Sequence, residues 1–372
     1  MNKSFCVLPF YRTVVRTNGG IAPCCQIQNY NNIKTTSIDS FWKDTKLVKL
    51  RQNMLDGIAN PECEICYKEE EKFGKSMRTE SLRDHAISDS TDLMSFVNGE
   101  KYLQRSFPNH LEFHTGNLCN LKCLTCRPQD SSSFLSEDKV LNISNHNQQD
   151  YQISQDIVDA TMQSVSAHGV EVLDLRGGET MLDPTIRQTV FDLPKDHKIK
   201  TLRLQTNCTI LDDFWKESFR KFETVEIMMS IDAHGLANEY IRYPSQWQQI
   251  EKNVDYFQSC SNTKIYVNCT ISNLNFLLLK PLIDWCDKKQ IYFHHSFCHY
   301  PRFYHYTNLP RSVYETGLER LQNWPGAASL ATSTADDSDW EIFCQTINKR
   351  DKHRRNSIFD ILPELKPYWK NS

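Results

Sequence analysis

Short apolar runs and longer amphipathic stretches alternate through the middle of the chain, from about residue 110 to residue 298. The short runs are rich in β-branched and aromatic residues, which predicts strands. The longer stretches carry apolar residues at helical spacing, and in residues 154–169 that pattern ends at Gly169, a residue type that caps helices. The predicted strands are HLEFHT (110–115), VEVLDLR (170–176), TLRLQTN (201–207), VEIMMSID (225–232), KIYVNCTIS (264–272) and IYFHHSF (291–297).

Six strands that alternate with helices predict an α/β fold with a parallel sheet, because strand–helix–strand units close as right-handed crossovers. Ligands of such sheets gather at the carboxyl ends of the strands, where the loops to the next helix begin. The segments that directly follow the strands are therefore the first places to look for chemistry. The other predicted helices cover residues 212–222, 245–260 and 277–289.

The two ends of the chain lack this alternation, so the sequence predicts three regions: 1–105, 106–300 and 301–372. The last region predicts helices, and its charged run KRDKHRR (349–355) is typical of the solvated face of a helix. A contact with an acidic substrate or a phosphate is the alternative for that run. A polar tract at 129–152 predicts a helix start followed by a mobile loop.

The composition is that of an ordinary soluble globular protein, with 39% hydrophobic and 24% charged residues. No stretch approaches the roughly 18 consecutive apolar residues of a membrane helix. The N-terminus has no sustained apolar core, so we expect neither a membrane span nor a signal peptide. A formal net charge of −3 argues against a protein that binds nucleic acid through its overall field.

Cysteine usage changes the picture, because the chain has fourteen cysteines and no predicted export signal. We expect a cytoplasmic protein, whose reduced thiols serve more often as metal ligands or catalytic groups than in disulfides. Scattered cysteines are expected to pack as small hydrophobes; hydrogen-atom donation by Cys208 or Cys269 is the minor alternative. The eight cysteines in tight arrangements are Cys6, Cys24, Cys25, Cys63, Cys66, Cys119, Cys123 and Cys126.

Three of these cysteines share one short segment, NLCNLKCLTCRP (117–128), directly after the first predicted strand. Four thiolates satisfy a structural zinc, whereas three leave a metal or cluster with an open coordination position. The C-x3-C-x2-C spacing of Cys119, Cys123 and Cys126 resembles the motif of the radical S-adenosylmethionine (SAM) superfamily. The resemblance implies that they hold a [4Fe–4S] cluster whose free iron binds SAM, which is then split to a 5′-deoxyadenosyl radical. Thr125 departs from the aromatic residue common in relatives.

Small motifs at the following strand ends are similar to the SAM-binding positions of that superfamily. In relatives a glutamate accepts hydrogen bonds from the SAM amino group, and an arginine pairs with the SAM carboxylate, which suits its forked guanidinium. Cys208 stands where relatives often have glycine. The residues that the resemblance implies for SAM binding are Gly177, Gly178 and Glu179 in LRGGE, Asn207 in QTNCT, Ser230 and Asp232 in MSID, and Arg242 in YIRYP.

The N-terminal cysteines form a second pattern: C-x12-G-x4-C through Gly19, followed by a C-x2-C pair. This is similar to the opening half of the SPASM auxiliary-cluster module, and more closely to its shortened form, the twitch domain. That module is best known after the barrel, whereas here it precedes it. Zinc is the alternative metal for four thiolates. The resemblance implies an auxiliary [4Fe–4S] cluster held by Cys6, Cys24, Cys63 and Cys66, with Cys25 as a substitute for Cys24.

The resemblance implies a radical SAM enzyme built as a partial (β/α)6 TIM-like barrel, with an N-terminal twitch-like subdomain and a C-terminal helical extension. Relatives with auxiliary modules mostly modify peptides or proteins, so we expect a peptide or protein substrate and an electron donor such as flavodoxin or ferredoxin. Oxidation or epimerisation of a carbohydrate or nucleoside is the alternative. A non-catalytic metal-binding interaction module is the alternative of another class.

Four histidines gather in and after the last predicted strand, but alternation places His294 and His295 on opposite faces of that strand. We therefore expect an aromatic-rich wall there rather than a compact histidine site.

Overall fold

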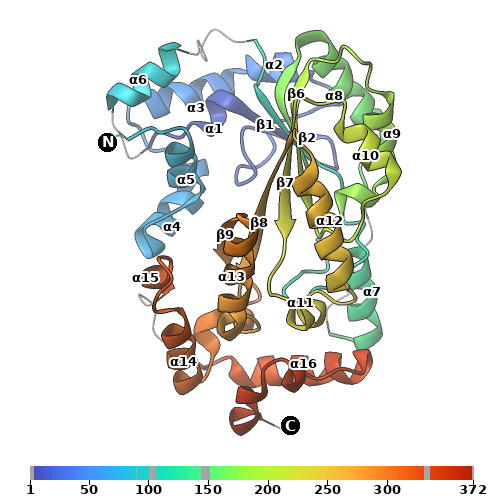
Figure 1. Cartoon of the computed structure of the whole chain (residues 1–372). Helices are drawn as coiled ribbons and strands as arrows, with labels where there is room; N and C mark the ends of the chain where they lie inside the picture. The colour runs from blue at the N-terminus through green and yellow to red at the C-terminus, as the bar shows by residue number, and fades with distance from the viewer. Residues whose placement is uncertain (1–3, 89, 100–105, 144–150, 331–335, 371–372) are drawn as a thin grey trace.

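The computed structural model describes residues 4–88, 90–99, 106–143, 151–330 and 336–370, and their strands form one nine-stranded sheet (Figure 1). The strand order is β3-β2-β1-β4-β5-β6-β7-β8-β9. The strands from β4 to β9 pair in parallel and in chain order, which confirms the predicted α/β fold with a partial barrel. They are β4 (His110–His114), β5 (Val170–Arg176), β6 (Ile199–Thr206), β7 (Thr224–Ser230), β8 (Thr263–Ile271) and β9 (Tyr292–Phe297).

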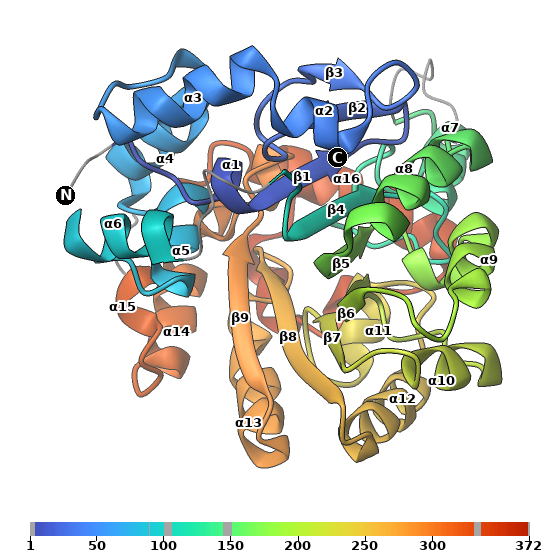
Figure 2. The ribbon, with the colours of Figure 1, turned by 90° about the horizontal axis from the view of Figure 1, so that it is seen from above.

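Amphipathic helices cover the outer face of the curved sheet (Figure 2). In α12 the apolar side chains of Trp247, Ile250, Val254 and Phe257 recur at helical spacing and are all buried. Gly169 ends α8 with a φ of +77°, as the sequence predicts. These helices are α8 (Gln155–His168), α9 (Pro184–Asp192), α10 (Asp213–Phe219), α12 (Trp247–Ser259) and α13 (Leu279–Lys289).

Two further helices lie at the carboxyl ends of the strands. The α7 helix (Ser132–Leu141) begins in the polar tract, where a helix start is predicted. The mobile loop predicted after it falls largely on residues 144–150, which lie outside the described residues. The α11 helix (Leu236–Ile241) directly follows the segment after β7 and was not predicted.

The N-terminal region extends the barrel sheet instead of folding apart from it. The β1 strand (Arg12–Val15) pairs in parallel with β4 and forms an antiparallel hairpin with β2 (Gly20–Ala22), after which β3 (Asn31–Asn32) ends the sheet. Gly19 turns this hairpin with a φ of +81°, a conformation that favours glycine. The helices are α1 (Leu8–Tyr11), α2 (Ile38–Trp42), α3 (Thr45–Leu55), α4 (Glu64–Phe73), α5 (Met77–Asp84) and α6 (Ser90–Gly99).

The same N-terminal region also reaches the far edge of the sheet. Figure 2 shows α5 on the open side of the barrel, between β1 and β9. Glu69, Met77 and Glu80 of this region, with His294 and His299 from the end of the sheet, are among the residues that line a pocket of about 160 Å³ there. The N-terminal helices therefore help to close the gap that six strands leave.

The C-terminal region consists of α14 (Arg311–Leu321), α15 (Ala327–Leu330) and α16 (Trp340–Arg354). The α16 helix crosses the carboxyl-end side of the barrel, near α7 and α11 (Figure 1). The prediction that its charged run is a solvated face is wrong for Arg350 and Arg354, which are both buried. Their i, i+4 spacing places them on the same helix face as buried Phe343 and Ile347.

Within the described residues, no helix combines the length and the apolar character that crossing a lipid bilayer requires.

Candidate functional site

The three-cysteine segment lies directly beyond β4, at the carboxyl ends of the strands, and its thiols are neighbours. Cys119 and Cys123 are buried around Leu121, and half-buried Cys126 packs against them. A turn brings the last two together, because the Cys126 amide donates to the Cys123 carbonyl at 3.0 Å. The structure therefore brings the three predicted cluster ligands together.

Burial and mutual repulsion disfavour three free thiolates here. Burial raises the pKa of Cys119 to about 12, and the neighbouring Cys123 adds to that rise. The pKa of Cys126 is raised by burial and by the same neighbour. Burial also raises the pKa of Cys123, although the guanidinium of Arg242 opposes it from 3.7 Å away. Such thiols become thiolates when a metal centre takes them as ligands.

Serine side chains of the polar tract hold the cysteine loop from one side. Ser131 Oγ donates to the Leu121 carbonyl at 2.8 Å, and Ser133 Oγ donates to the Cys119 carbonyl at 2.7 Å. The sequence by itself indicates only that these serines belong to a polar tract. Their role depends on the turn that brings α7 back onto the loop.

Gly177 and Gly178, which follow β5, allow the end of that strand to pack closely against the loop after β4. The Gly178 amide donates to the Gly116 carbonyl, and the Glu179 amide donates to the Leu118 carbonyl. A Cβ on Gly178 would lie 2.5 Å from the Leu118 carbonyl oxygen, and a Cβ on Gly177 would lie 2.2 Å from Thr115 Oγ1. In this structure the glycines make room for the chain's own backbone, and their place in SAM binding stays a prediction.

Glu179 is fully buried at the base of the cysteine loop. Burial raises the pKa of Glu179 to about 7, although three donors oppose that rise. The Thr206 hydroxyl lies 2.9 Å from Oε1, the Asn207 amide lies 2.7 Å from Oε2, and the Met181 amide lies 3.2 Å from Oε1. Glu179 is close enough to Cys119 to raise the pKa of that thiol.

Asn207 links the end of β6 to the cysteine loop. Its side-chain amide donates to Asn120 Oδ1 at 2.9 Å, and its Oδ1 accepts from Thr209. The next residue, Cys208, has a φ of +62°, which agrees with its place at a position where relatives often have glycine.

The β7 end supplies the acidic partner of the predicted SAM arginine. Arg242 Nε donates to Asp232 Oδ2 at 2.8 Å, and the other carboxylate oxygen accepts from the Thr270 amide at 2.8 Å. Ser230 lies at the end of β7, where its Oγ accepts from Gln205 at 3.4 Å. The predicted residues thus occupy successive strand ends around the three thiols, and their assignment to SAM stays a prediction.

Cys208 and Cys269, the two thiols considered as hydrogen-atom donors, are buried near site residues, and the Cys269 thiol lies 3.7 Å from the Asp232 carbonyl oxygen. Cys269 lies between Asn268 and Thr270 in β8 and is fully buried, with Asn275 Nδ2 at 3.5 Å from its Sγ. Cys208 is equally buried. Their complete burial suits core packing, and the alternative role in hydrogen-atom donation stays a prediction.

The N-terminal cysteines form a second group. The pKa of Cys6 is raised to about 12, mainly by burial, and the nearby Cys24 and Cys63 contribute to that rise. Cys63 and Cys66 lie one helical turn apart at the start of α4. Burial raises the pKa of Cys63 to about 12, with Cys24 and Cys66 adding to the shift.

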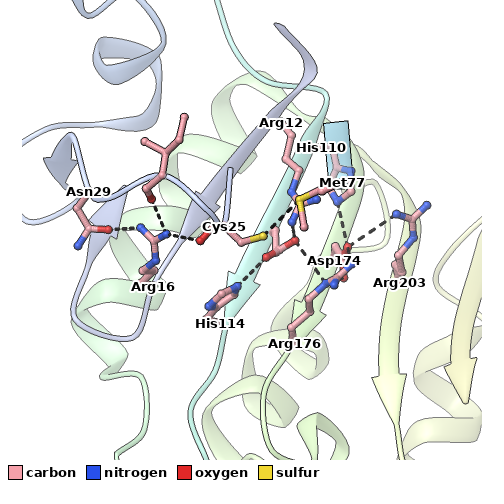
Figure 3. Close-up of polar contacts among 12 residues, drawn as sticks. Arg12, Arg16, Cys25, Asn29, Met77, His110, His114, Asp174, Arg176 and Arg203 are labelled. Carbon is pink, nitrogen blue, oxygen red and sulfur yellow. Dashed lines mark hydrogen bonds and ion pairs between the residues drawn. The ribbon is translucent and has the colours of Figure 1, made fainter. Parts of the chain in front are cut away.

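The Cys25 thiol contacts a residue outside this group, although Cys25 also adds to the rise that burial causes in the pKa of its neighbour Cys24. The Cys25 thiol contacts Met77 Sδ at 3.6 Å, and the Cys25 carbonyl accepts from Arg16 Nη2 at 3.0 Å (Figure 3). Because Cys24 is coupled to Cys6 and Cys63, the geometry favours Cys24 over Cys25 as the fourth ligand.

Figure 3 also shows a charged network inside the barrel that the sequence analysis missed. Glu112 and Asp174 are buried at paired positions of β4 and β5. Glu112 contacts Arg12 and lies 2.6 Å from His114 Nε2, and Asp174 lies 3.0 Å from Arg176 Nη2. The side chains of His114, Arg176 and Arg203 stay 33%, 32% and 26% exposed. In the barrel interior, partly exposed basic side chains therefore pair with acidic side chains that are buried.

The donor sets fit iron–sulfur clusters. In the described part of the chain, no three His, Cys, Asp or Glu side chains are grouped so that they could hold a single metal ion. A [4Fe–4S] cluster spreads its cysteine ligands over separate iron atoms, so thiols that are neighbours without meeting at one point suit it. The three thiols beside Arg242 form the predicted SAM-cluster set, and Cys6, Cys24, Cys63 and Cys66 form the predicted auxiliary set; both assignments stay predictions.

Comparisons with known proteins agree with this geometry. Residues 6–67 match the family model of SPASM, an iron–sulfur cluster-binding domain. GTP 3′,8-cyclase from Clostridium acetobutylicum is 22% identical over 176 residues, which cover 47% of this chain and 49% of that protein. The enzyme of the same name from Listeria monocytogenes is 22% identical over 172 residues, 46% of each chain. The chain thus matches about half the length of these curated relatives.

Solved structures also align with the chain at low identity. The structure of tagged anSMEcpe with bound AdoMet aligns with a TM-score of 0.45 and 17% identity, over 61% of each chain. Streptococcus suis SuiB bound to precursor peptide SuiA aligns with a TM-score of 0.40 and 16% identity, over 95% of this chain and 73% of that one.

The parallel barrel, the three-thiol loop at its carboxyl end and the SPASM match together make the chain similar to proteins of the radical SAM class. Its iron–sulfur SPASM region is N-terminal and shares the barrel sheet. The description of that family as cluster-binding supports iron–sulfur over the zinc alternative for residues 6–67.

Proposed function

We propose that this protein is an enzyme that reductively cleaves SAM at a cluster held by Cys119, Cys123 and Cys126. The resulting 5′-deoxyadenosyl radical abstracts a hydrogen atom from a peptide or protein substrate. The observation that carries the proposal is the group of three thiols beside Arg242 at the carboxyl end of the barrel, which no fourth cysteine of the described residues joins.

The cluster would supply the electron, and the chain's residues would bind and orient SAM. Arg242 is a donor for the SAM carboxylate, and its Nη1 already lies beside Cys123 while Asp232 holds its Nε edge. Glu179 accepts hydrogen bonds and is buried from water, so it suits an amino group of the ligand. Buried walls around these groups would keep water from the radical.

A SPASM region supports the peptide or protein substrate, because relatives with auxiliary modules mostly modify peptides or proteins. A nucleoside phosphate is the second candidate, since the curated relatives are named GTP 3′,8-cyclase. The partly exposed arginines of the barrel interior also suit an anionic group. An electron donor such as flavodoxin or ferredoxin would complete the system.

The test is formation of 5′-deoxyadenosine by protein purified without oxygen, given SAM and a strong reductant. Wild type should form 5′-deoxyadenosine. Cys123→Ala should form it at least about 100-fold more slowly, because an iron loses its ligand. Cys260→Ala is the matched control, since Cys260 is a partly exposed cysteine at the end of α12. It should retain the wild-type rate.

Equal rates in wild type and Cys123→Ala would overturn the proposal. A colourless protein that contains zinc and forms no 5′-deoxyadenosine would support the non-catalytic metal-binding module instead.

A further inference from the structure

The C-terminal helix α16 contacts both parts of the proposed SAM site, which are the cysteine loop and the segment that carries Arg242. Three of its residues, Arg350, Asp351 and Arg354, occupy one turn. Arg350 and Arg354 are buried, although two charged neighbours of the same run, Lys352 and His353, are exposed. Buried charges of this kind need specific partners, and those partners lie on the elements that carry the site.

One set of contacts holds the cysteine loop. Arg354 Nη2 donates to the Lys122 carbonyl at 2.5 Å, between Cys119 and Cys123. Its Nε donates to Glu137 at 2.9 Å. Arg350 donates to the other Glu137 oxygen at 2.6 Å and to Asp138 at 2.5 Å. The ion pairs join α16 to α7, the helix whose first residues hold the same loop.

A second set of contacts holds the segment that carries Arg242. The Tyr240 hydroxyl donates to Asp351 Oδ1 at 2.7 Å, and the Arg354 guanidinium lies over the Tyr243 ring at 5.0 Å. This segment also pairs with the cysteine loop through backbone hydrogen bonds. The Lys122 amide donates to the Tyr243 carbonyl at 2.6 Å, and the Leu124 amide donates to the Ile241 carbonyl at 2.8 Å.

The charge of Arg354 also suits a position beside a cluster. Its Nη1 is buried and has no hydrogen-bond acceptor among the described residues. Arg354 lies near enough to Cys123 to lower the pKa of that thiol against the rise that burial causes. A thiolate-ligated cluster at this loop would give the guanidinium a negative neighbour.

We propose that Arg354 and Asp351 are positioning residues, which lock the cysteine loop and the Arg242 segment into one unit through α16. The geometry of the cluster and that of SAM then depend on the C-terminal helix, although no residue of α16 belongs to either predicted ligand set. The interpretation of this unit as cluster and SAM site rests on the proposed function.

The test is hydrogen exchange on the full-length, anaerobically purified protein without SAM, with mass spectrometry resolving residues 119–126 and 236–243. Arg354→Gln should speed exchange of the Lys122 and Leu124 amides at least about tenfold, because their hydrogen-bonded segment loses its support. Tyr240→Phe removes a single hydroxyl and should speed the same amides by a smaller factor. Lys352→Gln, an exposed change on the same helix, should leave them at the wild-type rate.

The β1–β2 hairpin is an internal reference within the same molecules. Faster exchange confined to the two segments supports the proposal. Wild-type exchange at residues 119–126 in both variants, or equal acceleration of the hairpin, overturns it. If Arg354→Gln fails to fold, the exchange rate at residues 119–126 in Tyr240→Phe alone supports or overturns the proposal. Because no SAM is present, this result stands even if 5′-deoxyadenosine is never formed.

Discussion

His295, in the last barrel strand, has a pKa that its packing among aromatic side chains changes. It packs among the rings of Phe293, Phe297 and Trp324, whereas His294 lies 3.0 Å from Asn268 Oδ1 on the neighbouring strand. The two histidines thus follow the alternation that the sequence predicts. Burial lowers the pKa of His295 to about 4, and Lys75 and His294 contribute to the same shift.

His295 should make the fold sensitive to acid. Its pKa is near 6.5 in an unfolded chain and lower when folded, so the unfolded state binds the proton first. Stability from this residue is therefore complete above pH 6.5 and is lost as the pH falls toward 4. We expect a loss of about 2 kcal/mol after allowance for partial solvent screening.

The measurement is the free energy of unfolding by urea between pH 7 and pH 4. His295→Phe should show a shallower pH dependence than wild type, and the exposed control His353→Gln should match wild type. Identical slopes for wild type and His295→Phe would contradict the assignment.

At the residue scale, ligand sets that lie within a few positions of one another could be predicted from the sequence. Cys119, Cys123 and Cys126 share one loop, so their spacing alone places them together. The pairing of Glu112 with Arg12 could not be predicted, because the two residues meet only when β1 joins β4. Strand register, which no local pattern specifies, decides such pairs.

At the element scale, α7 and α16 form a buried electrostatic contact that stabilises the carboxyl-end side of the barrel. Glu137 is buried, and burial raises its pKa, but Arg354 and Arg350 more than offset that effect. The sequence could predict α16 as a helix. It could not predict that part of a hydrophilic run is buried, because the acidic partners lie more than 200 residues earlier.

Glu137→Gln should destabilise the protein strongly, because it leaves two buried guanidiniums without their shared carboxylate. Breaking a buried ion pair from one side typically costs about 3–5 kcal/mol. Urea unfolding at pH 7 would measure the change, with Glu341→Gln, an exposed change on α16, as the control. A loss below about 1 kcal/mol would show that this contact contributes little to stability.

At the scale of the whole molecule, the N-terminal SPASM region and the barrel form one continuous sheet. The six barrel strands and their order follow from the alternation of apolar runs, and the observed bounds agree with the predicted ones within a few residues. The edge at which the N-terminal hairpin joins was not predictable, since β1 has only four residues. The division into regions 1–105, 106–300 and 301–372 stays a prediction.

This arrangement puts two cysteine groups on one sheet, and only the group beyond β4 lies among the predicted SAM residues. Electron paramagnetic resonance of the reduced, anaerobic protein tests that distinction most directly. SAM should change the signal in wild type and in Cys63→Ala, because the proposed cluster on Cys119, Cys123 and Cys126 would leave one iron open to SAM. Cys123→Ala should show no SAM-dependent change. A wild-type signal that SAM leaves unaltered, or a SAM-sensitive signal in Cys123→Ala, would contradict the account.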